Sequence, residues 1–363
     1  MFLPLFLLTL AFVALSAVFI FGDLPSLRAT PIHKLRLQLV LLWNRLAASY
    51  HHIDTNVCHG RLAFYLNAVV PVAYLGLVTF CLHQFFSKTY PVLLQTPHGP
   101  NRSYIAFTVV LVYVATALAV FSDPGHASDS ALRRFRNNQL IFFDNKVCHT
   151  CDLVKPARSK HCSVCNSCYL LYDHHCVWIN NCVGYYNYRW FVLYLVANIN
   201  MLVYGGYVCF VSLQFERARL QSPGWWSLIS QTTAANEVTG IFVLLCIPFA
   251  IIASLFTALH IRYIYLGVTT NELDKWSEIE HLVRLGALYH LQSSDINGET
   301  YLEQASTKDG QTVYISLKNE AILIQGSDVH HYDLRQITSV ENELTNIYDR
   351  GFWNNARERL LLE

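Results

Sequence analysis

The chain has 363 residues, of which 53% are hydrophobic and only 14% are charged, and its formal net charge at pH 7 is +1. This composition is typical of an integral membrane protein and argues against a soluble globular protein. The basic residues form no long patch, so we expect no nucleic-acid partner.

Five apolar runs, each of about 20 residues and therefore long enough to cross roughly 30 Å of hydrocarbon, predict transmembrane helices. The runs lie near residues 2–22, 64–86, 104–122, 190–213 and 241–264. Each contains few or no charged residues. Asn198 and Asn200 lie within the fourth run, where we expect them to face the bundle interior and to form helix–helix hydrogen bonds.

The first run, 2–22, contains FVALSA, which is compatible with a signal-peptidase site. The run lacks a basic n-region, however, and it is longer than a usual h-region. Cleavage would also place the basic loops and the cysteine-rich segment in the lumen. We therefore expect an uncleaved membrane anchor.

The loops between the runs differ in their lysine and arginine content. Segment 23–62, segment 123–189 and the chain after residue 265 are rich in these residues, whereas 87–103 and 214–240 hold only two each. An excess of lysine and arginine marks cytosolic loops. The three rich segments are therefore predicted to be cytosolic, and the N-terminus is predicted to be lumenal.

Seven of the eleven cysteines lie between residues 148 and 182. On the reducing side of a membrane, such a density favours metal binding over disulfide formation. Of the remaining four, three lie within apolar runs, where we expect small buried hydrophobic residues; they are Cys81, Cys209 and Cys246. Cys58 lies in a predicted cytosolic loop, where we expect it to be inert, and the alternative is lipid modification.

The cysteine-rich segment contains two overlapping copies of one spacing, C-x2-C-x9-H-x6-C, displaced by fourteen residues. The first copy consists of Cys148, Cys151, His161 and Cys168. The second consists of Cys162, Cys165, His175 and Cys182. Three thiolates and one imidazole close a tetrahedral zinc site with no open position, so each copy predicts a structural zinc.

One cysteine of this segment is left over. A third copy would begin at Cys176, but Ile179 stands where its second cysteine is needed. His174 lies two residues before Cys176, and Asp173 lies three residues before it. A histidine that accepts the thiol proton, oriented by a carboxylate, would make Cys176 a nucleophile. The alternative is a purely structural thiol. His149 is also unused as a ligand, but no reactive group lies beside it.

Four stretches resemble motifs of one known family. DHHC at 173–176 resembles the signature of the DHHC protein S-acyltransferases, also called palmitoyltransferases. DPG at 123–125 directly follows the third apolar run, and TTNE at 269–272 follows the fifth, as the DPG and TTxE motifs do in that family. TNIYDRGFWNN at 345–355 is similar to the family's C-terminal motif of an asparagine, an aromatic residue and a glycine. The resemblance covers most of the chain from about residue 104 onward.

The resemblance implies an enzyme that transfers palmitoyl or other long acyl groups by a ping-pong mechanism. Cys176 would take the acyl group from acyl-CoA as a thioester and then pass it to a cysteine thiol of a membrane-associated protein. His174 would be the general base, and Asp173 would orient it. The eight ligands named above would bind two structural zinc ions, in agreement with their spacing.

Further positions match residues that contact the donor in this family. The basic stretch that lies near the CoA phosphates in such enzymes is matched by Lys155, Arg158 and Lys160. The alternative for these three is a solvated basic loop. Trp178 would contact the bound acyl chain, or it would belong to an interfacial aromatic belt.

Two positions resemble those that brace the catalytic loop from behind, namely Thr270 and Asn346. The alternative for both is helix or turn capping. Val177 departs from the family, which usually has proline after DHHC, and it leaves the backbone freer at that point.

We therefore expect an α-helical polytopic membrane protein with about five transmembrane helices and a cytosolic, zinc-stabilised cysteine-rich domain of short β-hairpins. The expected regions are an N-terminal membrane region 1–122, the zinc domain 123–189, a C-terminal membrane region 190–264 and a small cytosolic tail 265–363. In the tail, an alternating pattern around Asp309 and Gly310 predicts a small hairpin.

The variant DHHCVW at 173–178 resembles a subgroup of the endoplasmic reticulum and Golgi that is linked to SNARE-like and other single-span substrates. The additional N-terminal span fits this subgroup. The expected partners are therefore long-chain acyl-CoA, the lipid bilayer and proteins with juxtamembrane cysteines.

Two other classes of function compete with an acyltransferase. A non-catalytic, membrane-anchored zinc scaffold would use Cys176 only as a spare thiol or as an acylation acceptor. A scaffold does not need a base beside the thiol, so the set of Asp173, His174 and Cys176 argues against it. A transporter could use the five spans, but Asn198 and Asn200 alone give it little support.

Overall fold

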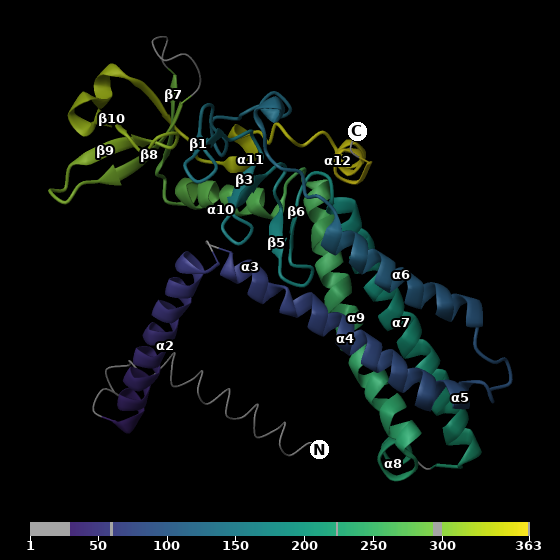
Figure 1. Ribbon diagram of the computed structural model, residues 1–363. Helices are drawn as coiled ribbons and strands as arrows, with labels where there is room; N and C mark the ends of the chain where they lie inside the picture. Colours follow the sequence, from purple (N-terminus) through teal and green to yellow (C-terminus); the bar gives the residue numbers. More distant parts are fainter. Residues whose placement is uncertain (1–29, 59–60, 223, 293–299, 362–363) are drawn as a thin grey trace. The chain divides into compact units, whose positions relative to one another are not determined.

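The computed structural model describes residues 30–58, 61–222, 224–292 and 300–361 (Figure 1). The chain forms two compact units, Met1–Leu66 and Asn67–Glu363. The first predicted run, 2–22, lies outside the described residues.

The described part of the first unit is dominated by helix α2 (Pro31–Asn56). Proline at the first helical position is pre-organised for a helix start, because its fixed φ fits the helix and its missing N–H would have no partner there. After the helix ends, the carboxylate of Asp54 accepts a hydrogen bond from the backbone N–H of Leu62 at 2.7 Å. This bond fixes the start of helix α3 (Leu62–Asn67).

Among the described residues, four helical segments are long and apolar enough to cross a membrane, and they confirm the second to fifth predicted runs. They are Leu62–Leu93, Arg102–Phe121, Tyr188–Arg219 and Ala234–Tyr265. The first comprises α3, α4 (Val69–Gln84), the π-helix η2 (Phe85–Thr89) and α5 (Tyr90–Leu93). The other three are α6, α7 and α9, and the short helix α8 (Trp225–Gln231) lies between the last two.

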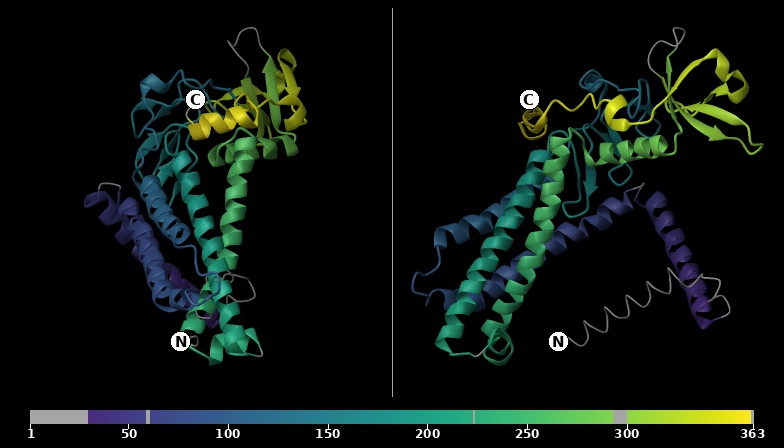
Figure 2. Two further views of the ribbon diagram at one scale, coloured as in Figure 1. Left: turned by 90° about the vertical axis from the view of Figure 1, so that its right-hand side faces the viewer. Right: turned by 180° about the vertical axis from the view of Figure 1, so that it is seen from behind.

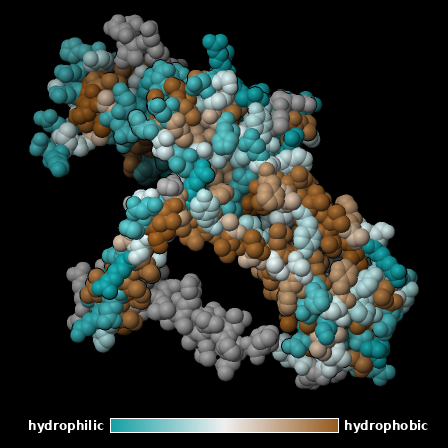
Figure 3. Space-filling model, in the orientation of Figure 1, coloured by the Kyte–Doolittle hydropathy of each residue, from teal (hydrophilic) through white to brown (hydrophobic). Residues whose placement is uncertain are grey.

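Helix α7 lies between α6 and α9 and packs along both (Figure 2). Small buried residues of α6, such as Ala115 and Ala119, let the backbones approach closely. Hydrogen bonds between helices also join them, as predicted: Tyr74 donates to Asn198 at 2.6 Å, and Tyr104 donates to Asn200 at 2.6 Å. Hydrophobic side chains dominate the surface of these helices (Figure 3). Such a surface suits lipid rather than water.

The zinc domain follows α6 and is built from three two-stranded antiparallel hairpins, as predicted. They are β1–β2 (Val147–Cys148 and Leu153–Val154), β3–β4 (Lys160–Cys162 and Ser167–Tyr169) and β5–β6 (His174–Cys176 and Asn181–Val183). A short 3-10 helix, η3 (Asp129–Ala131), precedes them. Two-stranded ribbons of two or three residues are not stable alone in water, so this domain needs a further source of stability.

The C-terminal region contains more structure than the single hairpin that was predicted. Helix α10 (Thr270–Arg284) leads into a five-stranded antiparallel sheet with the order β10-β9-β8-β7-β11. The predicted hairpin is present as β8 and β9, and Gly310 takes a φ of +77° in their turn. The five strands are β7 (Leu288–Gln292), β8 (Thr300–Ser306), β9 (Thr312–Ser316), β10 (Ile322–Gln325) and β11 (Asp333–Gln336).

Short helical segments complete this region. They are η4 (Gly326–His331), α11 (Val340–Glu343), α12 (Phe352–Ala356) and the π-helix η5 (Arg357–Leu361). Helix α12 packs against α9, and η5 packs against α7. The last described residues therefore return to the ends of the membrane helices at which the zinc domain also begins and ends.

Candidate active site and zinc sites

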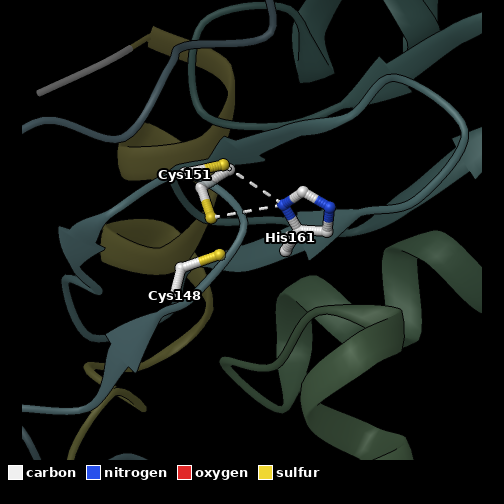
Figure 4. A group of neighbouring side chains, drawn as sticks. Cys148, Cys151 and His161 are labelled. Atoms are coloured by element: carbon white, nitrogen blue, oxygen red, sulfur yellow. Dashed lines mark hydrogen bonds between the residues drawn. The ribbon is translucent and has the colours of Figure 1, made fainter. Parts of the chain in front are cut away.

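The first predicted ligand set is brought together by β1, β3 and β4. The donor atoms of Cys148, Cys151, His161 and Cys168 lie within 4.8 Å of one another. Nδ1 of His161 lies 3.3 Å from Sγ of Cys151 (Figure 4). It lies 3.8 Å from Sγ of Cys168. Ligands at about 2.3 Å (sulfur) and about 2.0–2.1 Å (nitrogen) from a tetrahedral zinc lie roughly 3.5–3.8 Å apart. The cluster therefore has the dimensions of a zinc site.

The second set has the same dimensions. The donor atoms of Cys162, Cys165, His175 and Cys182 also lie within 4.8 Å of one another. Nδ1 of His175 lies 3.4 Å from Sγ of Cys165 and 3.7 Å from Sγ of Cys182, and the two sulfurs are 3.6 Å apart. Both sets fit structural zinc ions, which supply the stability that the short hairpins lack.

Strand β5 places its metal ligand, His175, on one face and His174 and Cys176, which belong to neither ligand set, on the other. It pairs with β6 in the register His175↔Cys182, so these two ligands face the same metal. Successive side chains of a strand point to opposite faces. His174 and Cys176 therefore project together from the other face of β5, and the geometry answers a question that sequence spacing alone leaves open.

His174 is oriented by a fully buried carboxylate. Nδ1 of His174 lies 2.9 Å from Oδ2 of Asp173, whose side chain is 0% exposed. The hydroxyl of Thr270 donates to the same oxygen at 2.6 Å, and the backbone N–H of Thr270 donates to Oδ1 at 3.2 Å. Arg359 donates to Oδ1 at 2.6 Å. Asp173 thus accepts hydrogen bonds from three residues that lie far apart in the chain.

These contacts set the charge state of the pair. Burial alone would raise the pKa of Asp173, but the hydrogen bond from His174 and the charge of Arg359 hold it well below its usual range. Burial alone would lower the pKa of His174, but hydrogen bonds with Asp173 and Cys176 raise it to about 9. The carboxylate therefore accepts from Nδ1 of the imidazole and leaves Nε2 for other partners.

Cys176 lies where the zinc domain meets the membrane helices. It is buried and packs in one hydrophobic cluster with Ala119 of α6, Ile179 of the same loop, and Phe191 and Tyr194 of α7. A thiol at the apolar end of a helical bundle can hold a long acyl chain away from water, which avoids a cost of about 0.8 kcal/mol for each exposed CH₂ group.

The DPG segment fastens this hairpin to the end of α6. The side chain of Asn181 in β6 donates to the backbone carbonyls of Ala119, Val120 and Ser122, the last at 2.8 Å. Gly184 approaches so closely that a Cβ atom there would lie 2.6 Å from the carbonyl oxygen of Pro124. Only glycine permits this approach without a backbone shift. The hairpin that carries Cys176 is therefore locked to a membrane helix.

Comparison with known proteins agrees with this geometry. The family model described as DHHC palmitoyltransferase matches residues 141–277. A palmitoyltransferase SWF1 from Candida albicans is 52% identical over 94% of this chain and 94% of its own length. The proteins of the same name from Debaryomyces hansenii and Saccharomyces cerevisiae are 46% and 29% identical, over 95% and 78% of this chain and 94% and 82% of their own lengths. This chain belongs to the DHHC palmitoyltransferase family.

As a member of this family, the chain is a membrane-bound protein S-acyltransferase that uses acyl-CoA as donor, and its two Cys/His clusters fit two structural zinc ions. The non-catalytic scaffold gains no support from these matches. The TTxE motif of the family is TTNE here, and its second threonine, Thr270, contacts Asp173 directly.

The predicted CoA-contacting residues are separated by the structure. Lys160 is exposed and, together with Asp173, His174 and Thr270, lines a pocket of about 440 Å³. Lys155 is half-buried and does not line this pocket. Trp178 is 61% exposed and also lies outside the pocket lining.

Arg158 has a different place from the one predicted. Its side chain is 2% exposed, and its guanidinium pairs with Glu272 at 2.6 Å and Glu358 at 3.1 Å and donates to the carbonyl of Gly267 at 3.1 Å. Because its donors are already engaged inside the protein, Arg158 is not available to a CoA phosphate. It joins the zinc domain to α10 and to the C-terminal segment instead.

Asn346 also acts at a distance from the catalytic loop. Its amide donates to the carbonyl of Leu266 at 3.0 Å, and its side-chain oxygen accepts from the N–H of Tyr348 at 3.1 Å. Asn346 therefore caps the end of α9 and forms a local turn, whereas Thr270 is the residue that touches Asp173.

Two residues of the site escaped the sequence analysis. His260 of α9 is buried, and its ring centroid lies 5.8 Å from that of His174. A histidine inside an apolar run is a signal of function that could have been used. Arg359 gave no such signal, because a basic residue in a charged tail usually lies in solvent.

Proposed function

We propose that Cys176 is the acylated nucleophile of this palmitoyltransferase, His174 its general base and Asp173 the residue that orients His174. The observation that carries the proposal is the placement of His174 and Cys176 on one face of β5, with the buried Asp173 carboxylate 2.9 Å from Nδ1 of His174. Neither zinc cluster uses any of these three residues.

In the first half-reaction, Nε2 of His174 accepts the thiol proton of Cys176, and the sulfur attacks the carbonyl carbon of acyl-CoA. The bond between that carbon and the CoA sulfur breaks, and the departing CoA thiolate takes the proton from His174. The products are an acyl thioester on Cys176 and free CoA. One thioester is exchanged for another, so no oxidant or external energy source is needed.

In the second half-reaction, a cysteine thiol of the acceptor protein gives its proton to His174 and attacks the thioester on Cys176. The bond to the Cys176 sulfur breaks, and that sulfur takes the proton back. Zinc, when bound, holds the hairpins in place and takes no part in the proton transfers.

We also propose where the enzyme works. The zinc domain 123–189 and the tail 265–363 lie in the cytosol, joined to the membrane regions 1–122 and 190–264, and the N-terminus is lumenal, in the endoplasmic reticulum or Golgi. The uneven loop content of lysine and arginine supports this orientation. Acceptors are single-span or SNARE-like proteins with juxtamembrane cysteines, because Cys176 lies at the ends of the membrane helices.

The lead test is autoacylation of the purified full-length protein with labelled palmitoyl-CoA. We expect label that hydroxylamine releases, its loss in Cys176→Ser and its slow appearance in His174→Ala, with about two zinc ions per chain in every sample. Cys209→Ser, which removes another buried thiol in α7, is the matched control and should label normally. Labelling of Cys176→Ser would exclude Cys176 as the nucleophile.

The acceptor proposal has its own test. A single-span reporter with one cysteine at the cytosolic membrane boundary should be acylated, and a reporter whose cysteine lies about 15 residues, or roughly 50 Å of extended chain, further away should not. Equal acylation of both reporters would contradict the juxtamembrane preference.

A further inference from the structure

The carboxylate that orients His174 receives a cation from the C-terminal segment. Oδ2 of Asp173 accepts from His174 and the Thr270 hydroxyl, whereas Oδ1 accepts from Nη2 of Arg359 at 2.6 Å and, at 3.2 Å, from the backbone N–H of Thr270. Arg359 belongs to η5 (Arg357–Leu361) and lies 186 residues after Asp173. The catalytic histidine and the tail therefore contact different oxygens of Asp173, and Thr270 contacts both.

The ion pair is closed to solvent on all sides. The side chains of Arg359 and Asp173 are 2% and 0% exposed. Nη1 of Arg359 donates to the carbonyl of Val268 at 3.0 Å, and its guanidinium carbon lies 3.9 Å from the ring centroid of Tyr188. Arg359 is thus fixed between α7, the segment that follows α9, and β5.

The buried ion pair of Arg359 and Asp173 carries a large desolvation cost, so it is a poor source of fold stability. Nε of Arg359 is buried without a hydrogen-bond partner among the described residues. The cost of desolvating two charges often equals or exceeds their attraction, and a hydrophobic pair of the same size would serve stability as well or better. A buried ion pair with an unpaired nitrogen is better explained by the geometry that it imposes on Asp173.

The C-terminal segment is held in place without Arg359. The amide of Asn355 donates to the carbonyl of Ile264 at 3.0 Å. Glu358 pairs with Arg158 at 3.1 Å and with Arg350 at 2.7 Å. These contacts do not involve Arg359, so the C-terminal segment should remain docked when the charge of Arg359 is removed.

We propose that Arg359 is a positioning residue of the acyltransferase, which holds Asp173 in the rotamer that directs Oδ2 at His174. This inference rests on the proposed function, because it acts through the Asp173–His174 pair. Without the arginine, Oδ1 loses its strongest partner, and the buried carboxylate can rotate away from the imidazole. The effect should appear in the rate of acyl transfer and not in the binding of acyl-CoA.

The test is single-turnover autoacylation of the full-length protein over a range of palmitoyl-CoA concentrations. Arg359→Gln should lower the maximal rate about 10- to 100-fold, as expected when a general base is misplaced, and should leave the half-saturating concentration unchanged within about twofold. Arg359→Lys keeps the charge but cannot bridge Asp173 and Val268 as a fork does, so it should recover part of the rate. Arg357→Gln, an exposed change in the same helical turn, should behave as wild type.

A double-mutant cycle separates positioning from a general structural role. If Arg359 acts through Asp173, then Arg359→Gln should cost nothing further in an Asp173→Asn background, whereas a structural defect would add to the loss. Every variant should retain about two zinc ions per chain. If Arg359→Gln loses zinc, Arg359→Lys decides: an intermediate rate with both zincs supports the proposal, and loss of zinc there too overturns it.

Three further results would overturn the inference alone: a wild-type rate in Arg359→Gln, a raised half-saturating concentration in place of a lowered rate, or additive losses in the cycle. A wild-type protein that takes up no label overturns the proposed function itself, and the inference with it. The two failures are therefore distinguishable in one experiment.

Discussion

Two neighbouring hairpins of the zinc domain share one pattern but differ in what they do. SKHC at 159–162 ends in strand β3, and DHHC at 173–176, fourteen residues later, ends in strand β5. In both, the histidine binds a zinc and pairs across its hairpin with the last cysteine of its own ligand set, in the registers His161↔Cys168 and His175↔Cys182. The cysteine after each histidine has a different role: Cys162 belongs to the second zinc cluster, and Cys176 belongs to none.

The difference shows how one repeat can give both a zinc ligand and a cysteine that belongs to neither ligand set. The first hairpin contributes Cys162 to the metal that holds the second hairpin, and the pattern ends there, so the corresponding cysteine of the second hairpin stays free. The residues at 159 and 160, serine and lysine, are replaced at the corresponding positions by Asp173 and His174. The second hairpin therefore depends on the first for a zinc ligand, whereas the first zinc cluster takes no ligand from the second hairpin.

The largest fall in autoacylation is expected when the second hairpin is given the residues of the first. The double change Asp173→Ser/His174→Lys converts DHHC to SKHC and leaves all eight zinc ligands and Cys176 in place. We expect autoacylation to fall by at least about 10³-fold, because the base and its orienting group are lost, while zinc content stays unchanged. Hydroxylamine-sensitive labelling and zinc analysis measure both; near-normal labelling would show that Cys176 needs neither residue.

The next largest effect should come from the first hairpin. Cys162→Ser removes a ligand of the second zinc from β3. We expect the loss of one zinc and a fall of about 10- to 100-fold in autoacylation, although Cys176, His174 and Asp173 are all intact. Ser163→Ala, at the next position, is the control. Retention of both zincs in Cys162→Ser would disprove the one-way dependence.

The third prediction concerns the hydrogen bond that Thr270 donates to Asp173, the residue that replaces serine in the second hairpin. Thr270→Val removes the hydroxyl that lies 2.6 Å from Oδ2 of Asp173 but keeps the shape of the side chain. A hydrogen bond to a buried charged group is worth enough to slow autoacylation about 10-fold. Thr270→Ser, which keeps the hydroxyl, should restore most of the rate; if Ser and Val behave alike, the hydroxyl is not what matters.

The smallest effect is expected at Lys160, which lies on the first hairpin but lines the pocket beside His174. Lys160→Ala should raise the half-saturating concentration of palmitoyl-CoA about 2- to 5-fold, because an exposed charge adds little to the binding of a phosphate. The effect should shrink as salt is added. Lys146→Ala, an exposed lysine outside the pocket, should change nothing; a salt-independent effect at Lys160 would argue against phosphate contact.

The contacts that sequence could predict are local ones. Two zinc clusters follow from ligand spacing, because a CxxC turn and a short hairpin bring such residues together wherever they occur. The membrane helices follow from the length of apolar runs. The turn at Gly310 could also be predicted from its local sequence. The pairing of β7 with β11 joins residues that lie far apart in the chain, so no local pattern predicts it.

The buried arginines could not be predicted for the same reason. Arg158 and Arg359 resemble surface residues in sequence, since burial of a guanidinium depends on partners elsewhere in the chain. Arg158 finds Glu272 and Glu358, and Arg359 finds Asp173. Sequence analysis therefore found the two ligand sets that the structure brings together and proposed the reactive residues, but it did not find the cations that pair with the buried carboxylates.

The distance in sequence between Asp173 and Arg359 has a consequence for biosynthesis. The zinc hairpins are complete once residue 182 has left the ribosome, so the domain can fold while the rest of the chain is still being made. The contact with Arg359 cannot form until a further 177 residues have been translated and two more helices have entered the membrane. A nascent chain stalled in between would hold all eight zinc ligands and Cys176 but not the arginine that pairs with Asp173, so we expect it to acylate more slowly than the full-length chain.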